Sequence, residues 1–312
     1  RKFFEFTNVR QGLLDVTGRL FGLTYDQIPD ARSWHADVTS YDVSLDGVRI
    51  GRIHLDLHPR EGKYNHAAPF DLVPGLRDVQ LPEGVLVCNF PRGLMEHGDV
   101  VTLFHEFGHL LHHTLAGRHD WIRFSGVATE WDFVEAPSQM LEEWAWDAEV
   151  LAGFASDASG VAIPADLVAR MRAGEEFGKG IMARTQTFYA AVSYRLHVER
   201  PRDITARVNE LASEYSLVAQ VPGTHFHTGF GHLEGYTSGY YTYKWSLVIA
   251  KDLFSMFDSA DLFAPEVARA YRDKVLVPGG SRDAADLVED FLGRPYNADA
   301  FKAWLDEAPE AR

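Results

Sequence analysis

Cysteine is almost absent from this chain, which contains a single one, Cys88, in 312 residues. A single cysteine excludes a disulfide within the chain and is typical of proteins from reducing compartments. We therefore expect a cytoplasmic protein. The first residues, Arg1-Lys2-Phe3-Phe4, lack both an initiator methionine and an apolar signal segment. We expect from this that residue 1 is not the natural start.

Long apolar runs and basic clusters are also missing. No apolar run approaches the roughly 20 residues that a transmembrane helix needs, so we expect no membrane-spanning segment. Lys and Arg number 30 against 45 Asp and Glu, which gives a net charge of −15. An acidic chain without a basic stripe is a poor match for nucleic acid or for an anionic membrane surface. We expect neither as a partner.

Apolar periodicity predicts a mainly α-helical protein that carries a small β-sheet. Residues 43–45 and 48–57 alternate apolar and polar side chains, and Asp46-Gly47 between them is a strong hairpin signal. A further short strand is expected at 85–90. The expected helices span residues 9–22, 99–116, 132–153, 164–199, 202–219, 239–258, 264–275, 282–292 and 298–306. We see no linker and expect one domain over residues 1–312, with the sheet region at about 39–91 and the helical body at about 99–306.

The segment His105-Glu106-Phe107-Gly108-His109 carries the clearest chemical signal. It has the H-E-x-x-H pattern, and one helical turn places both imidazoles on one face, where they can hold one Zn²⁺ at about 2.0–2.1 Å. Glu106 is then placed to take a proton from a water at that metal. The alternative is two hydrogen-bonded helix histidines without a metal. The apolar surroundings favour a metal, because a buried imidazole beside a carboxylate needs a partner.

A catalytic zinc needs a third protein ligand and one open position. The metzincin pattern would place a glycine and a third histidine where this chain has His112 and Leu115, which excludes that class. We expect the nearby His112 and His113 to lie on the helix surface or behind the ligands. The remaining source is a glutamate on a following helix. Four candidates lie downstream: Glu130, Glu135, Glu142 and Glu143.

Residues 105–109 and residues 132–142, Asp-Phe-Val-Glu-Ala-Pro-Ser-Gln-Met-Leu-Glu, resemble the thimet oligopeptidase family of zinc peptidases, which includes oligopeptidase A and peptidyl-dipeptidase. Further matching motifs lie in order along the chain, at 55–64, 230–246, 277–281 and 291–294. The resemblance implies a zincin-type, multi-helical catalytic domain. It matches only the C-terminal half of that family. The helical N-terminal half, which walls one side of a substrate channel, is missing, so a separate N-terminal piece is a possible partner.

The resemblance also assigns site residues. It implies that Glu135 is the third zinc ligand, and that Tyr236 and Tyr243 donate hydrogen bonds to the oxyanion, with His232 as a further donor. Tyr240 and Gly235 belong to the same glycine-rich loop and are expected to contact substrate, because such a loop can bend or let a peptide approach closely. The alternative is that Tyr236, Tyr240 and Tyr243 form one packed helical stripe, since spacings of four and three fit it.

Two further groups of residues complete the expected site. Zinc-bound histidines usually donate their other ring nitrogen to a carboxylate, carbonyl or water. Glu142 is a candidate acceptor, with Gln139 as runner-up and a surface salt bridge as the alternative. Close packing of strand 85–90 against Gly108 would explain a glycine inside that helix. In the family this strand borders the cleft and pairs with extended substrate, which makes Val87 and Asn89 candidate substrate contacts.

The sequence therefore predicts a metallopeptidase with one zinc per chain that hydrolyses peptide bonds in short oligopeptides. Either endopeptidase or dipeptidyl-carboxypeptidase action fits. One alternative is a zinc- and peptide-binding fragment with little turnover, because the N-terminal half is missing. Another is a structural zinc site, which would need a fourth protein ligand, and no cysteine or histidine is convincingly placed to supply one.

Overall fold

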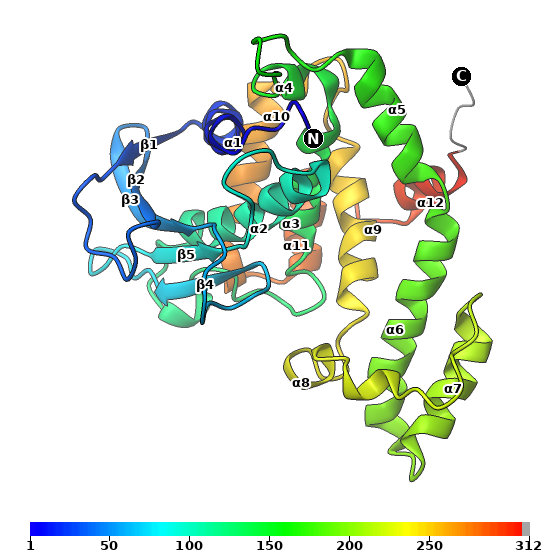
Figure 1. The fold of residues 1–312 in the computed structure, drawn as a ribbon. Helices are drawn as coiled ribbons and strands as arrows, with labels where there is room; N and C mark the ends of the chain where they lie inside the picture. The colour runs from blue at the N-terminus through cyan, green and yellow to red at the C-terminus, as the bar shows by residue number, and fades with distance from the viewer. Residues whose placement is uncertain (308–312) are drawn as a thin grey trace.

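A five-stranded mixed sheet lies at one side of the helices in a computed structural model that describes residues 1–307 (Figure 1). The strands are β1 (Leu23–Gln27), β2 (Thr39–Leu45), β3 (Val48–Asp56), β4 (Ala68–Val73) and β5 (Glu83–Val87). The helices are α1 (Phe6–Phe21), α2 (His97–Leu115), α3 (Ala136–Leu141), α4 (Ala148–Ala152), α5 (Ala165–Glu176), α6 (Lys179–Glu199), α7 (Ile204–Tyr215), α8 (His232–Gly235), α9 (Thr242–Phe254), α10 (Pro265–Tyr271), α11 (Ala284–Leu292) and α12 (Asp299–Asp306). The mainly helical fold with a small sheet agrees with the prediction.

The strand order in the sheet is β1-β2-β3-β5-β4, with β3 and β5 parallel and the other pairs antiparallel. The predicted hairpin is confirmed as β2 and β3. Asp46 and Gly47 join them with φ of 51° and 76°, the pair of positive angles that a tight two-residue hairpin turn requires. β1 and β4 were not predicted. Both are short outer strands, so neither shows a long alternating pattern.

Two of the predicted helices are interrupted. The helix expected over 132–153 begins only at α3, passes through a 3₁₀ segment (Glu142–Trp146) and restarts as α4, where Asp147 accepts a hydrogen bond from the backbone of Val150. The helix expected over 164–199 breaks between α5 and α6 at Gly178, which has φ of 79°. A positive φ cannot continue a right-handed helix. The prediction of continuous helices was wrong at both places.

Helix α2 lies at the centre of the core. Phe104 and Phe107 on this helix are fully buried. The sheet approaches α2 closely at Gly84 on β5, where an added Cβ would lie 2.6 Å from Leu110. Because its apolar faces are covered by the sheet and by α3, α2 has little freedom to shift, and the side chains that it carries are held in fixed positions.

Helices α6 and α7 form a hairpin that extends away from the sheet (Figure 1). It has a small core of its own, built by Phe188, Val192, Val208, Leu211 and Ala212. The chain then returns through α8 to α9, which packs against α3 beside α2. In the part of the chain that the structure describes, no helix is both long and apolar enough to cross a membrane.

Candidate metal centre

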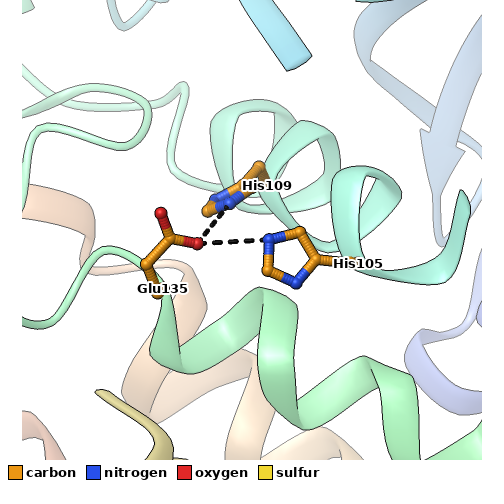
Figure 2. Close-up of side chains that lie close together, drawn as sticks. All are labelled: His105, His109 and Glu135. Carbon is orange, nitrogen blue, oxygen red and sulfur yellow. Dashed lines mark hydrogen bonds and ion pairs between the residues drawn. The ribbon is translucent and has the colours of Figure 1, made fainter. Parts of the chain in front are cut away.

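His105 and His109 project from one face of α2 toward Glu135 at the start of α3 (Figure 2). The Glu135 Oε2 atom lies 3.2 Å from His105 Nε2 and 3.0 Å from His109 Nε2. One ligand atom from each residue lies within 4.8 Å of the other two. Within residues 1–307, this is the one group of three or more His, Cys, Asp or Glu side chains close enough to hold a metal ion. Of the four candidate glutamates, it contains Glu135.

The donor set fits zinc. Two imidazole nitrogens and one carboxylate form a common ligand set of catalytic zinc sites, which leave a fourth position open. Burial alone would raise the pKa of Glu135, but hydrogen bonds from His105 and His109 hold it well below its ordinary value. The carboxylate is therefore ionised and turned toward both imidazoles, which is the form that binds a cation.

Two hydroxyl groups fix the orientation of Glu135, which is almost fully buried. Tyr236 Oη donates a hydrogen bond to Oε1 at 2.9 Å. Ser138 Oγ donates to the Glu135 carbonyl at 2.9 Å and lies 3.3 Å from Oε2. Ser138 was not among the predicted site residues, although it follows Glu135 by three residues in the same motif. With Oε1 held by Tyr236, Oε2 remains directed at the two histidines.

The other ring nitrogen of His105 meets Glu142, with 2.6 Å between Nδ1 and Oε1. The acceptor lies in the 3₁₀ segment that follows α3. A carboxylate on Nδ1 fixes the orientation of the ring and leaves Nε2 free to face Glu135. Gln139, the runner-up, makes a different contact and donates to the Tyr243 carbonyl at 3.0 Å. It therefore ties α3 to the start of α9.

Glu106 is the half-buried carboxylate of the motif. Burial raises the pKa of Glu106, although the neighbouring His105 and His109 act in the opposite direction. The hydrogen bonds of the site run to the carboxylates of Glu135 and Glu142, and within the described residues none runs to that of Glu106. A carboxylate that no protein group engages is available to accept a proton.

His112 and His113 are buried, which rules out the helix surface, the first of the two places expected for them. His113 contacts two neighbouring strands, with Nδ1 2.9 Å from Asp71 Oδ1 on β4 and Nε2 3.1 Å from the Glu83 carbonyl on β5. Burial lowers the pKa of His112 to about 3, so this ring is neutral at physiological pH. The sheet covers this face of α2 along its C-terminal half, which periodicity within one helix cannot reveal.

The two phenols expected at the oxyanion lie side by side above Glu135. Tyr236 ends α8 and Tyr243 lies in the first turn of α9, with ring centroids 5.3 Å apart and an angle of 21° between the planes. Tyr243 Oη lies 3.4 Å from His232 Nε2. Burial raises the pKa of both tyrosines, so both hydroxyls stay protonated and can donate.

The side chain of Tyr240, in contrast, is buried and supports the glycine-rich loop instead of facing substrate. It is 8% exposed, and its hydroxyl donates to Gln186 on α6 at 3.0 Å. Burial raises its pKa to about 12. This burial and hydrogen bond argue against Tyr240 as a substrate contact. The alternative of one helical stripe is wrong, because Tyr236 follows α8 and Tyr240 precedes α9. Gly235 is exposed, with no atom within 4 Å of an added Cβ.

The prediction that strand 85–90 pairs with substrate conflicts with the sheet topology. Val87 has ladder partners on both sides, Asp56 on β3 and Ala68 on β4. Asn89 lies beyond the strand, and its side chain donates to the carbonyls of Tyr64 and His66 at 3.0 Å each. The strand is interior because β4, which was not predicted, covers its outer edge.

Gly108 is explained by α3 and not by strand 85–90. An added Cβ would lie 2.7 Å from the Cα of Ser138, a backbone atom that cannot rotate away. The glycine thus lets α2 and α3 approach closely, and this approach places Glu135 against the histidines. The predicted cause was wrong, although the inference of a close approach at this turn is confirmed.

We predict that Gly108→Ala destabilises the protein by about 1–3 kcal/mol, because the new methyl group forces α2 and α3 apart. Gly98→Ala is the matched control on the same helix, since no atom lies within 4 Å of its added Cβ. The control should be neutral or more stable by up to about 1 kcal/mol. Thermal unfolding of both variants measures the difference, and equal unfolding temperatures would contradict the close packing.

Comparison with known proteins finds relatives named as oligopeptidases. The chain is 35% identical over 319 residues to oligopeptidase A of Escherichia coli K12, which covers 96% of this chain and 47% of the relative. It is 33% identical over 322 residues to thimet-like oligopeptidase of Dictyostelium discoideum, covering 96% and 48%. The chain therefore spans about half the length of these curated relatives.

Solved structures share the fold at low sequence identity. PZ peptidase A with inhibitor 2 superposes with a TM-score of 0.58 at 14% identity and covers 82% of this chain and 42% of its own. The carboxypeptidase of Pyrococcus furiosus gives a TM-score of 0.56 at 13% identity, covering 99% and 59%.

A family match extends over almost the entire chain. Residues 1–307 match the family described as peptidase family M3, a span that contains α2, Glu135 and residues 236–243. The several motifs that resembled a zinc peptidase family thus lie within one continuous match. The chain belongs to peptidase family M3.

Proposed function

We propose that this chain is the catalytic part of a zinc-dependent oligopeptidase, which hydrolyses peptide bonds in short peptides with one zinc per chain. One observation carries the proposal: Glu135 Oε2 lies within 3.2 Å of both histidine Nε2 atoms, while the Glu106 carboxylate, on the same helix as the histidines, makes no hydrogen bond to residues 1–307. The relatives named oligopeptidase support peptide substrates of limited length.

His105, His109 and Glu135 would hold the zinc. When bound, zinc supplies a Lewis acid that polarises a water molecule and the scissile carbonyl. Glu106 takes the proton from the attacking water and passes it to the leaving amine. Glu142 keeps the His105 ring turned so that Nε2 faces Glu135.

Tyr243 is the better placed oxyanion donor. Its hydroxyl lies 3.4 Å from His232 Nε2, at the outer limit of hydrogen bonding, so it can turn toward substrate. The Tyr236 hydroxyl is already bound to Glu135 at 2.9 Å. His232 is a secondary donor, and burial lowers its pKa, which favours the neutral ring.

An extended peptide can add a strand to this sheet only at an outer strand. The outer strands are β1 and β4, since β5 is paired on both sides. β4 lies beside β5 and against α2. We propose β4, with its exposed Phe70 and Leu72, as the substrate-facing strand in place of Val87.

We predict that Glu135→Gln lowers zinc affinity sharply and abolishes peptidase activity, because a neutral amide replaces the charged ligand. Glu143→Gln is the control, since Glu143 pairs with Lys251 and Arg172 away from the histidines. Zinc per chain and cleavage of a quenched fluorescent oligopeptide, with and without chelator, measure both effects. Mass spectrometry of the products separates internal cleavage from release of C-terminal dipeptides.

Wild-type protein with one zinc per chain and chelator-sensitive cleavage supports the proposal. Equal zinc content in wild type and Glu135→Gln would overturn the ligand assignment. Wild type that binds zinc and peptide but does not cleave would favour the binding-fragment alternative over the enzyme.

A further inference from the structure

Hydrogen bonds connect the residues just before Glu135 to the start of α9. Thr242 Oγ1 donates to the Trp131 carbonyl at 2.7 Å, and Ser246 Oγ donates to the Asp132 carbonyl at 2.8 Å. Both hydroxyl-bearing residues are fully buried. Tyr241 Oη adds a third bond, to Asp132 Oδ2 at 2.8 Å. Together these contacts join the segment that carries the metal-facing carboxylate to the segment that carries the phenols.

The Trp131 side chain packs on the tyrosine loop, residues 236–243. Its ring centroid lies 5.0 Å from that of Tyr236 in an edge-to-face arrangement. The loop backbone approaches the indole closely at Gly239, where an added Cβ would lie 2.6 Å from indole atoms. The indole therefore limits where the Tyr236 ring can lie.

Tyr236 in turn limits where Glu135 can point. Its hydroxyl holds Oε1 at 2.9 Å, and this leaves Oε2 facing both imidazoles. If the phenol moved, the carboxylate could rotate and lose one histidine contact. Mutation of a residue that orients a metal ligand in this way typically lowers metal affinity or activity by about 10–100-fold.

The loop is bent where it passes the indole. Thr237 has φ of 48°, an unusual angle for a β-branched residue, and its carbonyl accepts a hydrogen bond from Ser193 Oγ at 2.7 Å. Such a conformation persists only where the surrounding structure holds it in place. Ser193 on α6 holds the loop from one side, and Trp131 contacts it from the other.

We propose that Trp131 is a positioning residue for the metal centre: its indole holds Tyr236, and Tyr236 holds the Glu135 carboxylate toward the two histidines. This inference rests on the proposed zinc site. Half of the Trp131 surface is exposed, so the indole contributes less to the core than a buried aromatic residue would. Its removal should therefore affect zinc binding more than folding.

The test compares Trp131→Ala with Trp121→Ala, which removes another exposed indole ten residues upstream. Zinc affinity is measured on the full chain by competition with a chelator of known affinity. We expect Trp131→Ala to bind zinc about 10–100-fold more weakly than wild type, and Trp121→Ala to bind it as wild type does. Trp131→Phe keeps an aromatic edge on Tyr236 and should restore most of the affinity.

A double-mutant cycle tests the route through Tyr236. Tyr236→Phe alone should weaken zinc binding, and adding Trp131→Ala should weaken it little further, because both changes interrupt one chain of contacts. Fully additive losses would overturn the role. So would Trp131→Ala that binds zinc as tightly as Trp121→Ala.

Failure of the proposed function gives a different result. Wild type that binds no zinc would overturn the zinc site and this role with it, whereas normal zinc in wild type and in Trp131→Ala overturns the role alone. Circular dichroism and the unfolding temperature of the zinc-free proteins identify a variant that does not fold. If Trp131→Ala does not fold, Thr242→Val is measured in its place, because it removes a buried hydrogen bond to the Trp131 carbonyl. Unchanged zinc affinity of Thr242→Val would also overturn the role.

Discussion

Glu106→Gln should retain zinc and fold while losing at least about 10²–10⁴-fold in kcat, which is the typical contribution of a general base. Glutamine has nearly the same shape as glutamate but cannot accept the proton from the attacking water. The carboxylate makes no hydrogen bond or ion pair within the described residues, so its replacement breaks none. Steady-state kinetics on a quenched oligopeptide and the zinc content of the purified variant measure the two parts of the prediction.

Glu149→Gln on α4 is the control for charge loss and should be as active as wild type. Residual activity in Glu106→Gln must also disappear with chelator, which excludes a contaminating peptidase of another class. If Glu106→Gln contains zinc and keeps most of the wild-type kcat, Glu106 is not the base.

Local signals in the sequence predicted α2 and the β2–β3 hairpin, because both depend on residues close together in the chain. The turn at Asp46-Gly47 needs two positive φ angles, and those two residues adopt them readily. β4 was missed for the opposite reason. It contains Pro69, and its exposed residues include both Phe70 and Asp71, so it shows no clear alternation. Its position depends on pairing with β5, which follows later in the chain.

The residues of the metal centre likewise differ in whether a local sequence pattern predicts them. The spacing of His105 and His109 is fixed by one helical turn, so the pair could be found from the sequence. Glu135 lies 26 residues beyond His109, and four glutamates fitted the residue pattern until the family resemblance chose one. Trp131 was not found, because its contact with Tyr236 joins residues more than a hundred positions apart and no pattern along the chain records it.

The expected effect of Tyr243→Phe depends on where its hydroxyl acts. The change removes one oxygen and almost no volume, so the aromatic stack with Tyr236 at 5.3 Å should persist. If the hydroxyl only touches His232 at 3.4 Å, its loss should alter turnover little, because that contact is long. If it donates to the oxyanion, kcat should fall by about 10²–10³-fold, as for removal of one such donor elsewhere.

KM separates these cases further. An interaction that strengthens only in the transition state lowers kcat and leaves KM nearly unchanged, and we expect this pattern for Tyr243→Phe. Tyr189→Phe is the matched control, because Tyr189 belongs to the same aromatic cluster but packs against Phe226 and Tyr240 rather than above Glu135. Its kinetics should match wild type. Tyr236→Phe should differ from both and weaken zinc binding, since its hydroxyl holds Glu135. A Tyr243→Phe variant with wild-type kcat would leave zinc as the main stabiliser of the oxyanion and remove the phenol from the reaction.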